Sequence, residues 1–192
     1  LANLALAMLT LQAVTSGDAQ WPGRAFQRSK DASNMTDRLG AIEALVNAHA
    51  ELATPALERF HAQFRSHPLA LDKWFMLQAR AREQDGKVFA RVKQLLQHPD
   101  FTLANPNRAR ALVFSLTQFN PAAFHRADAA GYVFWAERVI ELDAINPQIA
   151  SRLARALDRW RSLAEPYRGA ARVALERVAA KVDLSGDTRE II

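Results

Sequence analysis

The chain has 192 residues, of which 49% are hydrophobic, and its 25 basic and 20 acidic residues give a formal net charge of +5. This length can bury one sizeable core, so we predict a single domain over residues 1–192. The absence of cysteine excludes a disulfide scaffold and cysteine-based zinc sites, and it is compatible with the cytoplasmic location that we expect. The mild positive charge permits an acidic partner without demanding nucleic acid.

The first fourteen residues are almost wholly apolar. They lack the basic leader and cleavage motif of a signal peptide, and they are shorter than the roughly 20 residues that span a bilayer. We therefore expect a buried helix over about 1–16, in a chain that is a piece of a larger multidomain protein.

In no segment do apolar and polar residues alternate with period two for long enough to predict a strand, and helix-forming residues dominate. Roughly ten helices joined by short loops predict an all-α fold, a superhelical stack of antiparallel helix pairs of the HEAT or armadillo kind (an α-solenoid). In the first half we expect helices over about 1–16, 35–48 (capped by Asn34) and 87–97, helices that start at Pro55 and Pro68, and a helical or irregular segment over 21–31. In the second half we expect helices over about 106–117, 128–144 and 165–180, a helix that starts at Pro147, and a short helix after Ser185-Gly186. Residues 120–125 are expected to form a loop.

Two Asn-Pro pairs, Asn105-Pro106 and Asn146-Pro147, predict helix starts, because Asn caps a free backbone N–H and Pro fits the first turn. They lie 146 − 105 = 41 positions apart, which fits a repeat of about 40–47 residues. In the helix predicted after the second pair, residues at helical spacing form two stripes, one apolar and one polar. The apolar stripe is Ile149, Leu153, Ala156 and Trp160, and the polar stripe is Gln148, Arg152, Arg155 and Arg159.

Catalytic motifs are missing from the sequence. The five histidines do not form the H-E-x-x-H zinc motif, and no G-x-S-x-G elbow, Walker loop or dinucleotide-binding turn is present. We therefore expect no catalytic residue, metal ligand or cofactor in this chain. His125 is expected to be a structural hydrogen-bonding residue, and the aromatic pairs Trp74-Phe75 and Phe134-Trp135 are expected in the core.

Seven segments, in order and spread over nearly the whole chain, resemble the C-terminal domain of bacterial aminopeptidase N, a gluzincin zinc exopeptidase. Residues 17–33 and 160–182 depart from the family pattern. The matching segments are Asn34-Met35-Thr36-Asp37-Arg38-Leu39, Asp72-Lys73-Trp74-Phe75, Asn105-Pro106-Asn107-Arg108, Asn120-Pro121-Ala122-Ala123-Phe124-His125, Gly131-Tyr132, Asn146-Pro147-Gln148 with Ala150-Ser151-Arg152-Leu153, and Leu184-Ser185-Gly186-Asp187.

The resemblance implies a parent enzyme that removes N-terminal residues from peptides with broad, often basic or alanyl, preference, and whose zinc lies in another domain. It implies that this domain caps the active site, with the catalytic domain of the same polypeptide and the peptide substrate as partners, rather than nucleic acid or a membrane. By resemblance, Gln148 and Arg152 contact the substrate beyond the scissile bond, and Arg110 lines the same chamber. A free-standing basic solenoid that binds nucleic acid or an acidic protein is the alternative.

Overall fold

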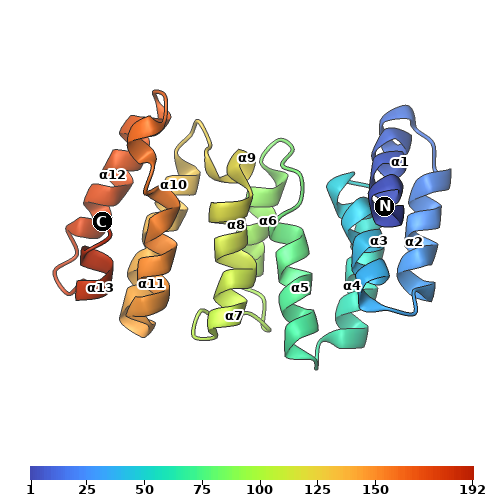
Figure 1. The fold of residues 1–192 in the computed structure, drawn as a ribbon, viewed down its shortest axis with the longest axis horizontal. Helices are drawn as coiled ribbons and strands as arrows, with labels where there is room; N and C mark the ends of the chain where they lie inside the picture. The colour runs from blue at the N-terminus through green and yellow to red at the C-terminus, as the bar shows by residue number, and fades with distance from the viewer. The chain divides into compact units, whose positions relative to one another are not determined.

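The computed structural model describes residues 1–192 and contains helices and no strands, which confirms the all-α solenoid prediction. None of its helices is both long and apolar enough to cross a bilayer. The α-helices are α1 (Ala2–Ser16), α2 (Gln20–Asp31), α3 (Met35–Asn47), α4 (Ala53–Phe64), α5 (Pro68–Ala79), α6 (Lys87–Leu95), α7 (Pro106–Ala109), α8 (Ser115–Phe119), α9 (Pro121–Phe124), α10 (Ala130–Ile145), α11 (Pro147–Ala154), α12 (Tyr167–Ala179) and α13 (Gly186–Arg189) (Figure 1).

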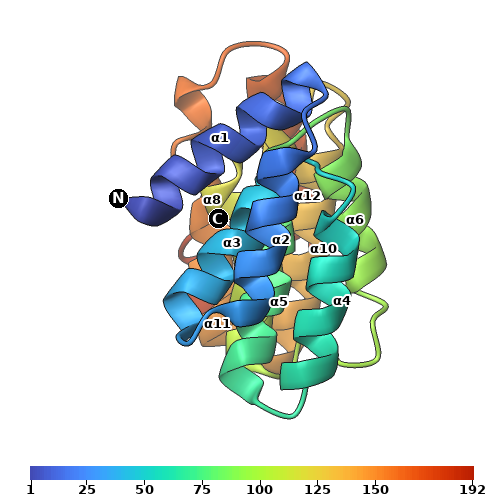
Figure 2. The same cartoon turned by 90° about the vertical axis from the view of Figure 1, so that its right-hand side faces the viewer.

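The chain divides into two compact units, Leu1–Arg82 with α1 to α5 and Glu83–Ile192 with α6 to α13. The single domain over residues 1–192 stays a prediction. In the first unit, α1 and α2 both pack against α3 (Figure 2). The buried face of α3 carries Ala41, Ile42 and Leu45, each at most 1% exposed, so α3 is the centre of this unit.

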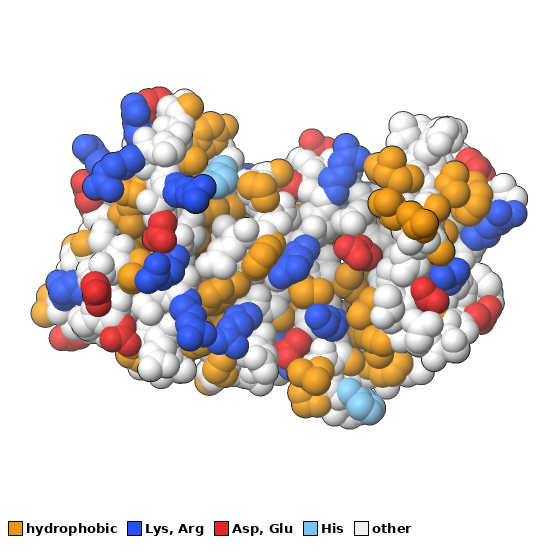
Figure 3. Space-filling view, viewed as in Figure 1, with side chains coloured by type: hydrophobic (Ala, Val, Ile, Leu, Met, Phe, Trp, Pro, Cys, Tyr) orange, Lys and Arg blue, Asp and Glu red, His pale blue; other side chains and the backbone are white.

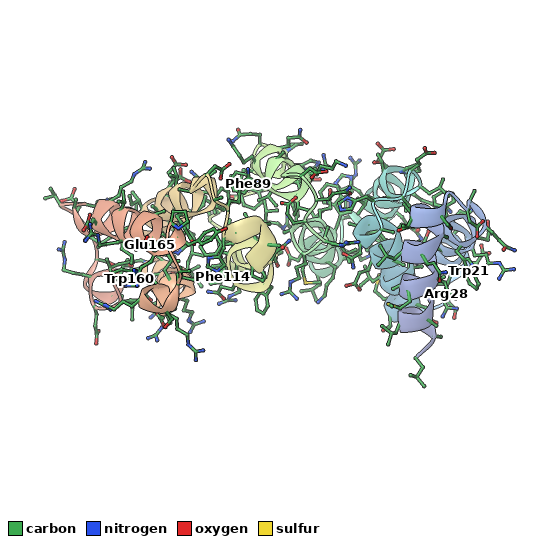
Figure 4. All side chains as sticks on the ribbon, turned by 90° about the horizontal axis from the view of Figure 1, so that it is seen from above. Trp21, Arg28, Phe89, Phe114, Trp160 and Glu165 are labelled. Carbon is green, nitrogen blue, oxygen red and sulfur yellow. The ribbon has the colours of Figure 1, made fainter.

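Side chains close the helix ends of the first unit. The side-chain oxygen of Asn34 accepts from the backbone N–H of Asp37 at 2.8 Å, as the predicted cap of this helix requires. Arg38 donates to the carbonyls of Ser29, Lys30 and Ala32 at the end of α2, where a helix leaves its last carbonyls without partners. In Figure 4, Trp21 and Arg28 lie on α2.

The second unit repeats the Asn-Pro start three times. Asn105, Asn120 and Asn146 each accept a backbone N–H of the following turn, and a proline occupies the first helical position each time. The cap at Asn120 starts α9, so the prediction of a loop at 120–125 is wrong. A helix forms at this site because Asn120 caps the backbone in the same way as Asn105 and Asn146 do at the other two sites.

The helix predicted over 106–117 is a continuous helical run, but its middle is a π-helical segment, Arg110–Phe114. The hydroxyl of Ser115 donates to the carbonyl of Arg110 at 3.3 Å. A π turn holds one more residue than an α turn, so the residues on either side are rotated about the axis relative to a regular helix. Buried Leu112 and Leu116, both 0% exposed, secure the run to the core.

The central helix of the second unit is α10, which packs against α11 and α12. The indole N–H of Trp135 donates to the carbonyl of Leu153 in α11 at 3.0 Å, and Trp135 is 0% exposed. A Cβ at Gly131 would lie 1.9 Å from the carbonyl oxygen of Phe124, so only glycine permits the close approach of α9 and α10. The expected core positions Trp74, Phe75, Phe134 and Trp135 are all buried, which confirms that prediction.

The last helix, α13, is joined to α10 by one carboxylate. Asp143 accepts from the backbone N–H of Ser185 at 2.9 Å and from the hydroxyl of Thr188 at 2.6 Å. Burial raises the pKa of Asp143, but the hydrogen bonds from Ser185 and Thr188 outweigh this, and the net pKa is lowered from 3.8. The Leu184-Ser185-Gly186-Asp187 segment therefore has a structural role, because its Ser185 holds α13 against α10.

Candidate substrate-contacting surface

The position of Gln148 and Arg152 follows from how α11 is built. Asn146 caps the helix by accepting from the N–H of Ile149 at 3.2 Å, and Pro147 occupies the first position. The inward face is made of buried Ile149, Ala150, Leu153 and Ala154. Gln148 and Arg152 are one helical turn apart on the opposite face, and both are exposed.

The Arg152 side chain has no hydrogen bond or ion pair, and neither has the Gln148 amide. The backbone of Arg152, by contrast, is fixed, because the amide of Gln118 on α8 donates to its carbonyl at 3.1 Å. A fixed backbone with a free guanidinium leaves the charge available to a ligand, and guanidinium groups bind carboxylates and carbonyls through charge-assisted hydrogen bonds.

Arg110 begins the π-helical segment and is exposed. Its guanidinium donates to the side-chain oxygen of Asn107 at 3.3 Å, one turn earlier. The sequence alone allows Arg108 to be a second surface cation, but this reading is wrong, because Arg108 is 6% exposed and donates to the carbonyl of Asp100. Of the two arginines only Arg110 can therefore reach solvent.

The structure brings the three candidate residues onto two neighbouring helical runs. Arg110 lies on the run that ends in α8, Gln148 and Arg152 lie on α11, and the Gln118–Arg152 hydrogen bond joins the two runs. On the face seen in Figure 3, Lys and Arg side chains lie over α11 and between α11 and α7. We call the exposed side chains of Arg110, Gln148 and Arg152 the α11 surface.

The sequence predicts that the polar stripe continues from Arg152 to Arg155 and Arg159, but it ends at Arg152. The α-helix ends at Ala154, and residues Arg155–Leu157 form a 3₁₀ turn, in which Leu157 rather than Ala156 is buried. Three residues per turn instead of 3.6 rotate the later side chains away from the register of α11. Arg155 lies 3.8 Å from the carboxylate of Asp158, so its charge is partly satisfied within the chain.

His125 is a structural residue, as predicted. Its Nδ1 lies 2.8 Å from the hydroxyl of Tyr132, and its ring packs near Phe124 with ring centroids 4.9 Å apart. Burial lowers the pKa of His125, and burial raises the pKa of Tyr132 to about 12, so this pair is neutral near pH 7. A neutral pair within the α9–α10 packing has no role at the α11 surface.

Sequence reasoning missed Gln118, which positions the backbone of Arg152. It also missed Asp143, which joins α13 to α10. Both act on residues 34 or more positions away, and neither belongs to a local motif that could have revealed it.

Residues 1–192 match the family described as "Domain of unknown function (DUF3458_C) ARM repeats". Aminopeptidase N of Caulobacter vibrioides is 42% identical over 83% of this chain, and aminopeptidase N of Escherichia coli is 39% identical over 84%. The chain spans 18% of the length of each of these relatives. Aminopeptidase A of Legionella pneumophila, crystallised in complex with aspartic acid, superimposes with a TM-score of 0.83 at 30% identity, over 90% of this chain and 20% of that one.

These matches agree with the seven sequence segments and with the helical fold. The chain belongs to the DUF3458_C family of ARM-repeat domains, and its recognition as the C-terminal domain of an aminopeptidase N is confirmed.

Proposed function

We propose that this chain is the non-catalytic lid of a zinc-dependent aminopeptidase N. It covers the active site of the catalytic domain in the same polypeptide, limits entry to short or unfolded peptides, and contacts the substrate beyond the scissile bond. The enzyme removes N-terminal residues, alanine among them, and we place it in the cytoplasm. The zinc and the groups that carry out hydrolysis come from the catalytic domain.

The observation that carries this proposal is the α11 surface. A stable helix requires only the buried face of α11, yet the exposed face presents a cation and an amide with no partner in the chain. The relatives named aminopeptidase N supply the context in which those groups would meet a peptide.

The chemistry of each residue suits a different part of a peptide. Arg152 can donate two parallel hydrogen bonds to the two oxygens of a carboxylate, or it can donate to the single oxygen of a backbone carbonyl. Gln148 can both donate and accept, so it can bind the peptide backbone without reading its sequence. Arg110 adds positive charge on the neighbouring run, which favours the carboxylate end of a short peptide.

The test compares two substrates of the full-length enzyme. Arg152→Ala is expected to lower kcat/KM for tripeptides about tenfold, as loss of one charge-assisted hydrogen bond would, and to leave single-residue chromogenic amides nearly unchanged. Such amides have no residue after the scissile bond for Arg152 to contact. Arg159→Ala is the matched control, because Arg159 is an exposed arginine outside α11.

Equal losses on both substrates would contradict a contact beyond the scissile bond. Unchanged kinetics combined with DNA binding that weakens steeply with salt would favour the alternative of a basic binding module. The exposed arginines at 152, 155, 159 and 161 are the feature that such a module would use.

A further inference from the structure

The first unit contains a cleft that the proposed function does not use. It has a volume of about 540 Å³ and lies between the turn that follows α1 and the turn that follows α3. Ligand pockets usually have volumes of about 300–1,000 Å³, so this cleft is large enough for a small organic molecule. All of its lining residues belong to the first unit.

Two sharp helix ends build the cleft. Gly17, with φ of 76°, ends α1, and the N–H of Asp18 donates to the carbonyl of Ala13 at 2.8 Å. His49, with φ of 52°, ends α3, and the N–H of Ala50 donates to the carbonyl of Leu45 at 3.0 Å. These left-handed residues turn the chain abruptly, so that Asp18, His49 and Glu51 come to line one cleft.

The carboxylates of Asp18 and Glu51 line the cleft, and an ionised carboxylate only accepts hydrogen bonds. The Nε2 of His49 lies 2.7 Å from the carbonyl oxygen of Arg82, which only accepts, so Nε2 carries a hydrogen and donates it to Arg82. One oxygen of Asp18 accepts from the N–H of Gln20 at 2.8 Å. The Glu51 carboxylate has no hydrogen bond, and neither carboxylate has an ion pair.

The rest of the lining is apolar. Val14, Pro22, Ala50 and Leu52 contribute carbon surface beside the two carboxylates. An inorganic cation would gain nothing from that surface. An alkyl chain that ends in a cation would bury its methylene groups there, at about 0.8 kcal/mol for each CH₂ fully removed from water, while its charge lies near Asp18 and Glu51.

We propose that this cleft binds an alkylammonium or alkylguanidinium group carried on a short methylene chain. The cation of the ligand lies beside the carboxylates of Asp18 and Glu51, and its methylene chain lies on the apolar wall. A free diamine and the side chain of a lysine residue share this chemistry. The site is independent of the α11 surface, which belongs to the other unit.

The experiment titrates the isotope-labelled 192-residue chain with cadaverine and, separately, with N-acetyl-lysine amide, and follows the backbone amide signals by NMR. Saturable shifts centred on Gly17, Asp18, Ala50 and Glu51 are expected with at least one of the two. Tighter binding of cadaverine identifies a free diamine as the source, and tighter binding of the lysine amide identifies a peptide side chain. Pentanol has the same methylene chain without the charge and should not bind.

Glu51→Gln should weaken binding about threefold, as loss of one exposed ion pair does, and Asp18→Asn with Glu51→Gln should weaken it about tenfold. The amide oxygen that Asp18→Asn introduces would still accept from the N–H of Gln20, so the turn is retained. Glu43→Gln, at an exposed glutamate of α3 outside the cleft, is the matched control. Absence of shifts with both amines, equal binding of pentanol, or equal weakening by Glu43→Gln would overturn the proposal.

Discussion

Helices α10 and α11 are neighbours in the chain and in space, yet they differ in what their side chains do. Gly131, Trp135 and Asp143 of α10 each meet a specific partner on another element. Only one face of α11 is so constrained, and its other face carries the unpaired Arg152 and Gln148. The contacts of α10 therefore determine how the second unit packs, whereas the exposed face of α11 makes no side-chain contact that the fold requires.

The largest effect is expected at Gly131. In Gly131→Ala the new methyl group would lie 1.9 Å from the carbonyl oxygen of Phe124, so backbone must move, and we expect a loss of about 3 kcal/mol or more in the free energy of unfolding. Urea denaturation measures this loss. Gly23→Ala is the control, since nothing lies within 4 Å of its new Cβ and alanine favours a helix. Equal effects of the two changes would show that α9 and α10 are not closely packed.

A smaller effect is expected at Asp143. Asp143→Asn removes the charge that Ser185 and Thr188 bond to, and we expect a loss of about 2 kcal/mol near pH 7. The pKa of Asp143 is lower in the folded chain than the ordinary value of 3.8, so its contribution is complete above that value and is lost as pH falls below about 4.

The unfolding free energies of the native chain and the Asp143→Asn variant should therefore converge as pH falls from about 5 toward about 3. Asp187→Asn is the control, because Asp187 is an exposed carboxylate at the same helix as Thr188. A difference between the native chain and Asp143→Asn that stays constant over this pH range would contradict the charged link.

Substitution of Gln118 tests whether the contact that fixes the backbone of Arg152 also matters for the proposed substrate contact of its side chain. Gln118→Ala removes the hydrogen bond to the carbonyl of Arg152, and the expected loss is about 1 kcal/mol. In the full-length enzyme the same change should weaken tripeptide hydrolysis more than hydrolysis of single-residue amides, because Arg152 would be less well positioned. Loss of stability without any kinetic change would show that the position of Arg152 does not matter to the substrate.

The smallest effect on stability is expected at the α11 surface itself. Arg152→Ala and Gln148→Ala remove exposed side chains without partners, so the free energy of unfolding should stay within about 0.5 kcal/mol of the native value. Thermal unfolding of the two variants beside Gln118→Ala measures the difference. A large loss at Arg152 would place it among the fold-determining residues and contradict the difference between α10 and α11.

Local signals in the sequence predicted much of the fold. Asn34, Asn105 and Asn146 cap helices because a cap depends on only three or four consecutive residues. The exposed positions of Gln148 and Arg152 followed from helical periodicity, although their role came from resemblance and stays a prediction. Met35, which the helical period assigns to the apolar stripe of α3, is 38% exposed, because a residue in the first turn lies at the margin of the packed face.

What the sequence could not predict depends on distant residues. No local pattern indicates the π-helical segment at Arg110–Phe114 or the end of α11 at Ala154, because the hydrophobic period continues through both. The links from Gln118 to Arg152 and from Asp143 to Thr188 join positions 34 and 45 residues apart. Such contacts are fixed only when the helices have packed.

The bond between Asp143 and α13 has a practical consequence for anyone who shortens this polypeptide. A version that stops near residue 180 retains all of α10 to α12 but lacks the four-residue helix α13. It would nevertheless leave the Asp143 carboxylate facing the vacated site without the groups that now donate to it. The damage from such a deletion would therefore fall on α10, and it would not show that residues 181–192 have a function of their own.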